Sequence, residues 1–474
     1  MKVSSFIRVG HELVAAEVEL TLGPGLPQFS FIGLPDVALR ESGMRVRSAL
    51  REQGFELPQQ AVLVHIKPTF LKKTSRGLDL AIASALLWET GQLSLPDETP
   101  VLYGELTLKG EVVQPDDLIE APEHAGMLIT GRSPAPLSFA TRQISNLASM
   151  IDGGDLVPPS VDFQFSRPGL TIKQLPREAA EFAKVVAAGE HSILMAGPPG
   201  SGKSTLADHL AAWVEAPTLE TLKEVRHFWS ARRASPLAWR PVLKPHHSIT
   251  PLAMIGGGAS LWPGEITRAH GGILIMDEML EFHPEIQEAL REPVESGCIS
   301  LVRAGASRTY PARVLLIGTT NLCACGNFVP RRKKMSSCRC AKAIRRKILT
   351  RLTGPFVDRF ALIALTDTWT DSDLVSVDTV TCDVERAIAF RRARGQIVPN
   401  SRLAPEPIEE TLGEFEIQHI LKTAARSRRR RAALLRVART LADLRESTMI
   451  SIADLERARE MTVQTHRLLE EWTD

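Results

Sequence analysis

The sequence predicts a multidomain α/β protein, with an α+β region first, a parallel-sheet region in the middle and a helical region last. Three observations predict it. Strand-like and helical runs alternate up to about residue 160, buried apolar strands separated by helices follow to residue 368, and helical periodicity dominates the remainder. A length of 474 residues is also that of about three domains, each with its own core.

Residues 1–160 form the first predicted domain. Its apolar and alternating runs predict three strands and two helices: strands at Val14–Leu20, Val62–Ile66 and Val101–Leu108, and helices at Val37–Gln53 and Leu78–Trp88. Proline and polar residues from Pro158 to Gly169 indicate a linker, assigned to residues 161–176.

Residues 177–368 form the second predicted domain, and residues 369–474 the third. Strands are expected at Ile193–Ala196, Ile273–Met276 and Val314–Gly318. Helices between such strands imply a parallel, doubly wound sheet with its ligand at the carboxyl ends of the strands. In the last domain, helices are expected at Arg428–Arg445 and Ile452–Glu471, the second after a capping box that begins at Ser451.

Composition excludes several classes of protein. The formal net charge is only +2, so binding to a polyanion requires local clusters of charge. Glu12, Glu17 and Glu19 interrupt any secretory signal, and no run approaches the roughly 20 apolar residues of a membrane span. Six cysteines in a chain of this length do not make a disulfide scaffold. We therefore expect a cytoplasmic protein without a membrane partner.

The segment Gly197–Ser204 matches the phosphate-binding pattern G-x-x-x-x-G-K-[ST] between a predicted strand and a predicted helix. In such a loop, backbone N–H groups surround the phosphates of ATP, the lysine reaches the phosphate oxygens and the serine holds Mg²⁺. The alternative is an ordinary glycine-rich turn. The residues predicted to bind the nucleotide are Gly197, Pro198, Pro199, Gly200, Ser201, Gly202, Lys203, Ser204 and Thr205.

Two acidic residues end the next apolar strand. A triphosphatase needs one carboxylate to orient Mg²⁺ and a second to polarise the attacking water. Asp277 fits the first role and Glu278 the second, although a solvated acid pair at a strand end is the alternative. Asn321 ends a third strand, where it could position the water or simply form a turn.

Four cysteines form two short pairs separated by twelve residues. Four thiolates suit a tetrahedral Zn²⁺ ion, and the alternative is a loop with four reduced thiols. The candidate zinc ligands are Cys323, Cys325, Cys338 and Cys340. Cys298 and Cys382 have no partner nearby in the sequence, and the adjacent His246 and His247 are interpreted as structural, because they would point apart if extended.

The segment around these cysteines is strongly basic, with no acidic residue between Cys323 and Arg351. Such a run is either a solvated surface or a contact for nucleic-acid phosphates. A predicted hairpin at 299–309 adds two further arginines around a glycine turn. The candidate DNA contacts are Arg303, Arg308, Arg331, Arg332, Lys333 and Lys334.

Short motifs along nearly the whole chain resemble the ComM/YifB family of bacterial magnesium-chelatase-like AAA+ proteins. In order, the matching segments are Phe31–Asp36, Pro245–Ser248, Gly256–Gly258, Pro263–Glu265, Met276–Glu278, Leu290–Pro293, Tyr310–Ala312, Asn321–Gly326, Gly354–Phe360 and Val437–Asp443. The chain departs from the usual family pattern at Thr171–Pro176, before the phosphate loop, and it lacks two prolines at Asn321–Cys325.

The resemblance implies a Lon-protease-like domain at 1–160, an AAA+ ATPase core at 177–368 with a cysteine-rich basic insertion at 323–351, and a helical lid at 369–474. It implies ATP hydrolysis in a homo-hexamer, with Arg359 as the arginine finger and Arg429 as the sensor arginine. For both arginines a surface salt bridge is the alternative. The hairpin that carries Arg303 and Arg308 would line the pore of the ring.

The family therefore implies an ATP-driven DNA motor, a branch-migration helicase of natural transformation or recombination. A chelatase-like motor for metal insertion into a tetrapyrrole is a second possibility. A Lon-like peptidase is a third, but it needs a serine activated by a lysine. The aligned positions are near Gly77 and Ala121, with Ser75 and Lys73 close by, so peptidase activity is not expected.

Overall fold

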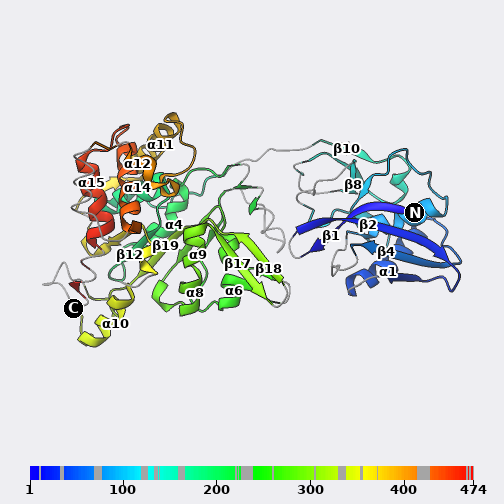
Figure 1. The fold of residues 1–474 in the computed structure, drawn as a ribbon, viewed down its shortest axis with the longest axis horizontal. Coiled ribbons are helices and arrows are strands. Elements are labelled where there is room, and N and C mark those ends of the chain that lie inside the picture. The colour runs from blue at the N-terminus through cyan, green and yellow to red at the C-terminus, as the bar shows by residue number, and fades with distance from the viewer. Residues whose placement is uncertain are drawn as a thin grey trace. The chain divides into compact units, whose positions relative to one another are not determined.

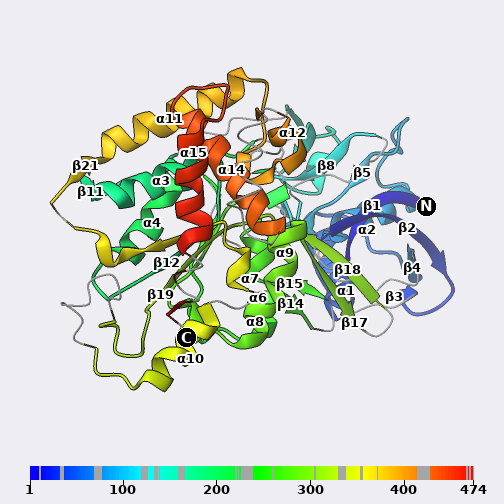
Figure 2. The ribbon, with the colours of Figure 1, turned by 60° about the vertical axis from the view of Figure 1, so that its left-hand side comes forward.

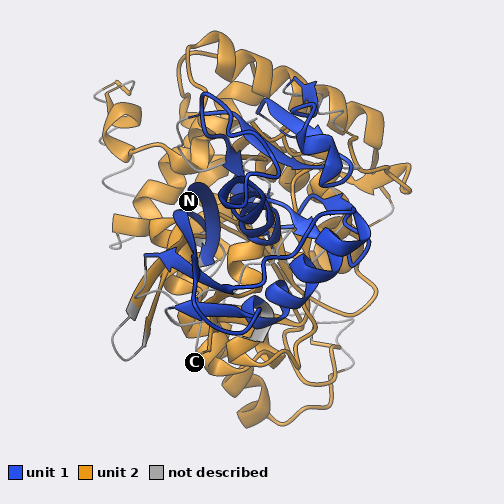
Figure 3. Cartoon of the chain, turned by 90° about the vertical axis from the view of Figure 1, so that its right-hand side faces the viewer, with its two compact units in different colours: residues 1–164, 223–236 blue, residues 165–222, 237–474 orange. Residues whose placement is uncertain are grey.

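The chain forms two compact units in the computed structural model, residues 1–164 with 223–236 and residues 165–222 with 237–474 (Figure 1, Figure 3). The structure describes residues 1–9, 12–32, 37–68, 77–118, 126–132, 137, 139–158, 166–218, 221–222, 224–225, 239–258, 261–303, 306–328, 338–352, 356–370, 372–410, 412–413, 428–465, 468 and 471–472.

An eight-stranded mixed sheet with strand order β10-β9-β8-β5-β1-β2-β4-β3 organises the first unit. Strand β4 alternates between buried and half-buried residues, the pattern of a sheet with one face on a core. The strands are β1 Lys2–Val9, β2 Glu12–Gly23, β3 Phe29–Ile32, β4 Ala61–Lys67, β5 Val101–Leu102, β8 Leu128–Gly131, β9 Thr141–Ile144 and β10 Asp155–Val157.

Helices α1 (Val37–Glu52) and α2 (Asp79–Glu89) contribute to the core of this unit, and a 3₁₀ turn covers Ala148–Met150. Both helices match the predicted ones. The strand predicted at Val101–Leu108 is wrong as a single element, because the chain leaves the large sheet after β5 and forms β6 (Glu105–Leu106), which pairs with β7 (Val112–Val113). The break falls where the carbonyl of Gly104 accepts a hydrogen bond from the N–H of Leu80 at the start of α2.

A five-stranded parallel sheet with strand order β13-β16-β19-β12-β20 forms the centre of the second unit. Strands β12, β16, β19 and β20 are buried at every residue, as expected for a parallel sheet covered on both faces. The strands are β12 Ile193–Ala196, β13 Val242–Leu243, β16 Ile273–Met276, β19 Leu315–Thr320 and β20 Leu362–Leu365. All three strands predicted here are confirmed, with β19 extending two residues beyond its predicted end.

Helices from the middle and the end of the chain share one hydrophobic core with this sheet, and α3, α4, α11, α14 and α15 gather around β12 and β19 in Figure 2. The helices are α3 Arg177–Gly189, α4 Lys203–Trp213, α6 Pro251–Ile255, α7 Glu265–Arg268, α8 Pro284–Ala289, α9 Arg291–Ser296, α10 Lys342–Leu352, α11 Val377–Ala393, α12 Pro405–Glu409, α14 Arg428–Leu444 and α15 Ile452–Arg459.

The last helices largely follow the sequence prediction. Helix α14 matches it within one residue, and Ser451 and Asp454 form the predicted capping box at the start of α15. After Arg459 the chain continues as a π-helical stretch, Glu460–Gln464. No helix in the described ranges is long and apolar enough to cross a membrane.

Short elements complete the second unit. Strand β11 (Gln174–Pro176) lies in the predicted linker and pairs with β21 (Leu374–Ser376), and β14 (Gly256–Gly257) pairs with β15 (Trp262–Pro263). The predicted hairpin is confirmed as β17 (Cys298–Arg303) and β18 (Ala306–Pro311). Short 3₁₀ turns cover Met279–Glu281, Val357–Arg359, Thr366–Thr368 and Asn400–Arg402.

Candidate nucleotide site and arginine cavity

The phosphate-binding loop joins β12 to α4 at the carboxyl edge of the parallel sheet. Gly200 and Gly202 have φ of +75° and +84°, a region that glycine enters without the steric cost of a side chain. The Nζ atom of Lys203 donates hydrogen bonds to the carbonyl oxygens of Gly197 and Pro198, at 3.0 and 2.6 Å. Burial lowers the pKa of Lys203 to about 8, against the opposing effect of Asp277 and Glu278.

The structure brings the predicted Mg²⁺ ligands together. Ser204 is the last residue of the loop, and its Oγ donates a hydrogen bond to Oδ1 of Asp277 at 3.0 Å, although the two residues are 73 positions apart in the sequence. Burial opposes ionisation of Asp277, but hydrogen bonds from Thr319, Ser204 and Lys244 outweigh it and hold its pKa below the usual value. The carboxylate is therefore charged at neutral pH, as a hard cation requires.

Thr319, a residue that the sequence analysis missed, fixes the two acids relative to each other. Its hydroxyl donates to Oδ1 of Asp277 and accepts the backbone N–H of Glu278 at 3.1 Å. Glu278 has φ of +53°, a left-handed conformation that is uncommon for a non-glycine residue and is often associated with functional sites. Strand β19 lies between β12 and β16, and only that strand order places Thr319 beside Asp277.

A lysine and a histidine also lie near the acids, and the sequence analysis assigned neither to the site. Lys244 lies 3.2 Å from Asp277 and 3.1 Å from Asp208. His247 Nδ1 lies 3.9 Å from Glu278. The expectation that His246 and His247 point apart is wrong, because the chain turns here and their ring centroids are 4.1 Å apart.

Residues of the phosphate-binding loop, the two acids and Thr319 line a cleft of about 320 Å³. Its described lining includes one lysine, two carboxylates and four hydroxyl side chains, but no arginine. A loop that presents backbone N–H groups, an ammonium and an ionised carboxylate is a donor set that fits a nucleoside triphosphate with Mg²⁺. Described residues that line the cleft are Pro199, Gly200, Gly202, Lys203, Ser204, Thr205, Asp277, Glu278, Thr319, Thr320 and Asn321.

Arg359 lies at the opposite edge of the sheet from the cleft. It lies three residues before the start of β20, and its carbonyl accepts a hydrogen bond from Ser192, which directly precedes β12. Strands β12 and β20 are parallel, so both residues lie at the amino ends of strands whose carboxyl ends face the nucleotide loop. Four residues of strand span roughly 13 Å. Arg359 therefore does not line the cleft of its own chain.

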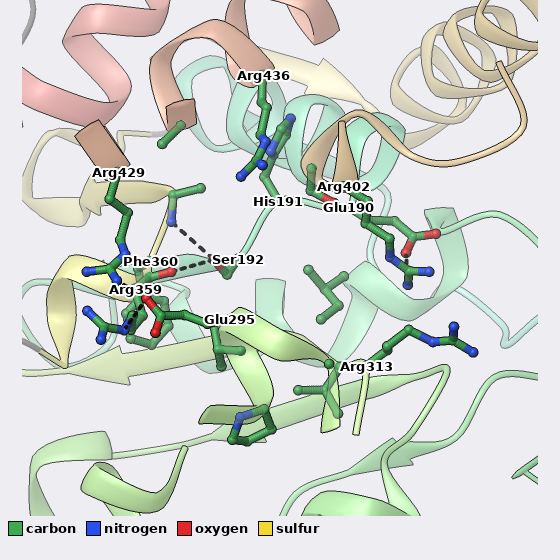
Figure 4. A pocket seen from close by; sticks show the side chains of 18 of the residues that line it. Glu190, His191, Ser192, Glu295, Arg313, Arg359, Phe360, Arg402, Arg429 and Arg436 are labelled. Carbon is green, nitrogen blue, oxygen red and sulfur yellow. Dashed lines mark hydrogen bonds and ion pairs between the residues drawn. The ribbon is translucent and has the colours of Figure 1, made fainter. Parts of the chain in front are cut away.

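Arg359 and Arg429 instead line a second cavity, of about 540 Å³, at this amino edge (Figure 4). Nε of Arg359 lies 3.3 Å from Glu295, and Arg429 pairs with the same carboxylate and with Asp358, the latter at 3.3 Å. Burial lowers the pKa of Arg359; the charge of Asp358 opposes this effect, and the charge of Arg291 adds to it. The charged residues in the described lining are Glu190, Glu295, Arg313, Asp358, Arg359, Arg402, Arg429 and Arg436.

The arginines at the start of α14 make different contacts in the fold. Arg430 is buried and its guanidinium pairs with Asp358 at 2.7 Å and donates to the carbonyl oxygens of Val357 and Phe360. Arg430 therefore anchors the turn that contains Arg359 to helix α14. Arg431 pairs with Glu409, and among residues 428–431 Arg429 is the one that lines the cavity.

The four predicted zinc ligands converge, because the ligand atoms of the cysteines all lie within 4.8 Å of one another. Sγ of Cys323 is 3.4 Å from that of Cys325, and Sγ of Cys338 is 3.6 Å from each of the two. Zn–S bonds of about 2.3 Å in a tetrahedron separate the sulfurs by about 3.8 Å. Hydrogen bonding from the Asn327 backbone and neighbouring thiols lowers the pKa of Cys325 to about 6. The donor set thus fits Zn²⁺.

The candidate DNA contacts are only partly described. Residues 331–334 lie outside the described residues, and so does the side chain of Arg303. Arg308 pairs in register with the buried Leu301 and is itself half-buried, whereas Val302 on the other face of the hairpin is 78% exposed. Helix α10 supplies described basic residues that are exposed: Lys342, Arg346, Lys347 and Arg351.

Known proteins and family models match this chain over most of its length. The fold and the cleft define a P-loop α/β protein. The family model "Magnesium chelatase, subunit ChlI" matches residues 173–374, and "Subunit ChlI of Mg-chelatase" matches residues 18–125.

Among curated relatives, uncharacterized protein YifB of Salmonella typhimurium is 31% identical over 93% of this chain and 92% of its own length. YifB of Escherichia coli is equally similar. Competence protein ComM of Haemophilus influenzae is 30% identical over 76% of this chain and 75% of its own length. The chain belongs to the ComM/YifB family of magnesium-chelatase-like proteins.

Proposed function

We propose that this protein is an ATP-driven motor that acts on DNA as a homo-hexamer in the cytoplasm. The position of Arg359 supports this proposal most directly. A guanidinium at the amino edge of the sheet does not reach a nucleotide bound by the loop of its own chain, because that loop lies at the carboxyl edge. It becomes useful when the neighbouring subunit presents its bound nucleotide to the arginine cavity. A ring of such contacts couples hydrolysis to assembly.

The residues of the cleft have distinct roles in this proposal. Lys203 and the loop N–H groups bind the β- and γ-phosphates, while Ser204 and Asp277 hold Mg²⁺. When bound, that ion neutralises charge on the phosphate oxygens. Glu278 accepts the proton of the attacking water, and Asn321 at the cleft wall orients that water.

The neighbouring subunit completes the site. Its Arg359 stabilises the charge that develops on the transferred phosphoryl group, and its Arg429 acts as the sensor of the nucleotide. The helices after residue 369 form the lid, and the first unit is a Lon-like scaffold.

Branched or single-stranded DNA is the proposed substrate of the motor. Support comes from the exposed basic residues of α10, which lie next to the cysteine cluster, and from the name of the relative ComM, a competence protein. We propose branch migration during transformation or recombination as the activity. Zn²⁺ bound by the four cysteines would shape this basic segment.

ATP turnover measured with and without a four-way DNA junction tests the function. We expect the junction to stimulate hydrolysis, and labelled junction arms to separate when ATP is present. The variant Lys203→Ala is the blank, because it removes the ammonium from the loop. Absence of DNA binding at low salt, together with unstimulated turnover, would contradict the DNA motor.

A chelatase-like motor is the second candidate, and the family model that covers residues 173–374 favours it. It predicts ATP hydrolysis that is unaffected by DNA and is stimulated by partner subunits that hold a tetrapyrrole.

A peptidase has less support. Gly77 has no nucleophile and packs so closely that a Cβ would lie 2.4 Å from the Tyr103 ring, while Lys73, Ser75 and Ala121 lie outside the described residues. Release of peptides from casein would support peptidase activity.

A further inference from the structure

The cysteine cluster and the nucleotide loop are in contact. Gly326 follows Cys325 directly, and its N–H donates to the carbonyl of Cys323 at 3.0 Å to close a turn. Gly326 is buried with φ of +77°, and a Cβ at this position would lie 2.6 Å from Cδ of Pro199. Pro199 belongs to the phosphate-binding loop and lines its cleft. One turn therefore touches both the cysteine sulfurs and the nucleotide site.

We infer that Zn²⁺ bound by the four cysteines holds the turn Cys323–Gly326 against Pro199 and thereby sets the affinity of the loop for nucleotide. The inference rests on the proposed zinc site and on the proposed binding of ATP. It goes beyond both, because it assigns the metal an effect on the nucleotide and not only on the fold of the basic segment.

The contact is suited to transmit such an effect. The glycine backbone meets the proline ring directly, with no flexible side chain between them. The ring closes on the backbone nitrogen of Pro199, so a shift of Gly326 displaces the loop itself. Cys338 and Cys340 lie more than ten residues further along the chain, and their sulfurs lie within 4.8 Å of those of Cys323 and Cys325. Metal ligation would hold this junction together, whereas the same sulfurs without a metal ion would interact only weakly.

The same turn is connected to the basic helix. Cys340 lies two residues before α10, and the guanidinium of Arg345 in that helix stacks over the ring of Phe328 at 5.1 Å. Phe328 is two residues after Gly326. A polyanion bound to α10 would therefore act on a segment that contacts the phosphate-binding loop. The turn Cys323–Gly326 is therefore one described connection between the basic helix and the phosphate-binding loop.

The experiment measures the dissociation constant of a fluorescent ADP analogue, with Mg²⁺ in excess, for the full-length protein. The protein is assayed as purified, after removal of zinc with phenanthroline, and after zinc is restored. We expect affinity to fall by about fivefold or more on removal, because a loop that is no longer held in place must be ordered by the ligand. We expect zinc to restore it. The variant Cys382→Ser is the matched control, since Cys382 is exposed on α11 and outside the cluster.

Two variants separate the metal from the contact. Cys340→Ser should lose zinc and nucleotide affinity together. Gly326→Ala should keep zinc but lose affinity, because its Cβ meets the Pro199 ring; circular dichroism and thermal melting verify that both variants fold. Unchanged affinity after zinc is demonstrably removed would overturn the inference and leave the zinc site intact. Purified wild-type protein without zinc would overturn the zinc site and this inference with it, and wild type that binds no nucleotide would overturn the proposed function.

Discussion

The nucleotide cleft and the arginine cavity are complementary in charge and opposite in construction. The cleft combines a phosphate-binding loop and two carboxylates with no arginine in its described lining. The cavity has five arginines against three acids in its described lining and no phosphate-binding loop. In the proposed function, each region supplies what the other lacks for phosphoryl transfer.

The two regions also differ in how their charges are held. In the cleft, two hydroxyls and one lysine hold the acid: Thr319 and Ser204 donate to Asp277, and Lys244 pairs with its other oxygen. In the cavity, carboxylates hold the cations: Glu295 pairs with both Arg359 and Arg429. An arginine held in this way must exchange its ion pairs before it can bind a phosphate.

Removing Arg359 tests whether the two regions work together. Arg359→Ala should lower ATP turnover by about 10³-fold, because the finger stabilises transition-state charge. Binding of a fluorescent ATP analogue should be unchanged, since Arg359 does not line the cleft of its own chain. Turnover and binding are measured on the same preparation.

Mixing this variant with Lys203→Ala should restore part of the turnover, because one chain then supplies the nucleotide loop and the other the arginine. No recovery of turnover in assembled mixtures would contradict the idea of two half-sites.

The acid pair provides a second test, confined to the cleft. Glu278→Gln should lower turnover by about 10²-fold or more by removing the base, while the amide retains the size of the side chain. ATP should still bind, because Lys203 and Asp277 remain. Single-turnover hydrolysis and equilibrium binding distinguish the two steps, with Glu281→Gln as a matched control on the following 3₁₀ turn. Equal loss in both variants would remove Glu278 from the chemistry.

Nucleotide affinity should depend on pH through Lys203. Burial lowers its pKa to about 8, so the lysine is charged below that pH and becomes neutral above it. The terminal phosphate, with a pKa of about 6, stays ionised throughout. Affinity for ADP should therefore change little from pH 7 to 7.5 and fall by about fivefold between pH 8 and pH 9. Titrations across this range check it, and a flat profile would show that the ammonium does not contribute.

The smallest expected effect is at Glu295 in the arginine cavity. Glu295→Gln removes the charge that competes with a phosphate for Arg359 and Arg429. Because this carboxylate is 42% exposed, solvent screens the pair, and turnover should rise by no more than about threefold. Asp358 also pairs with Arg429, so turnover of Asp358→Asn is measured beside that of Glu295→Gln to compare the effects of the two carboxylates. A fall of tenfold or more would mean that Glu295 positions the arginines and does not restrain them.

The comparison also separates what was predictable from what was not. Loop Gly197–Ser204, the strand that ends at Asp277 and the capping box at Ser451 were predictable, because each is a local pattern in which neighbouring residues determine backbone conformation. The break between β5 and β6 was missed for the opposite reason. At this break the carbonyl of Gly104 accepts a hydrogen bond from a helix more than twenty residues earlier, a pairing that a local pattern does not contain.

The sequence by itself determined the nucleotide loop, the two acids, the paired cysteines and, through its motifs, the family. Only the tertiary structure decided that Thr319 locks the acid pair, that Arg430 fixes the turn of Arg359 and that Gly326 abuts Pro199. These contacts depend on the order of strands in a sheet and on which side of a helix faces the core. A motif encodes the local conformation of the chain, whereas such pairings arise when buried elements pack, so no single segment of sequence contains them.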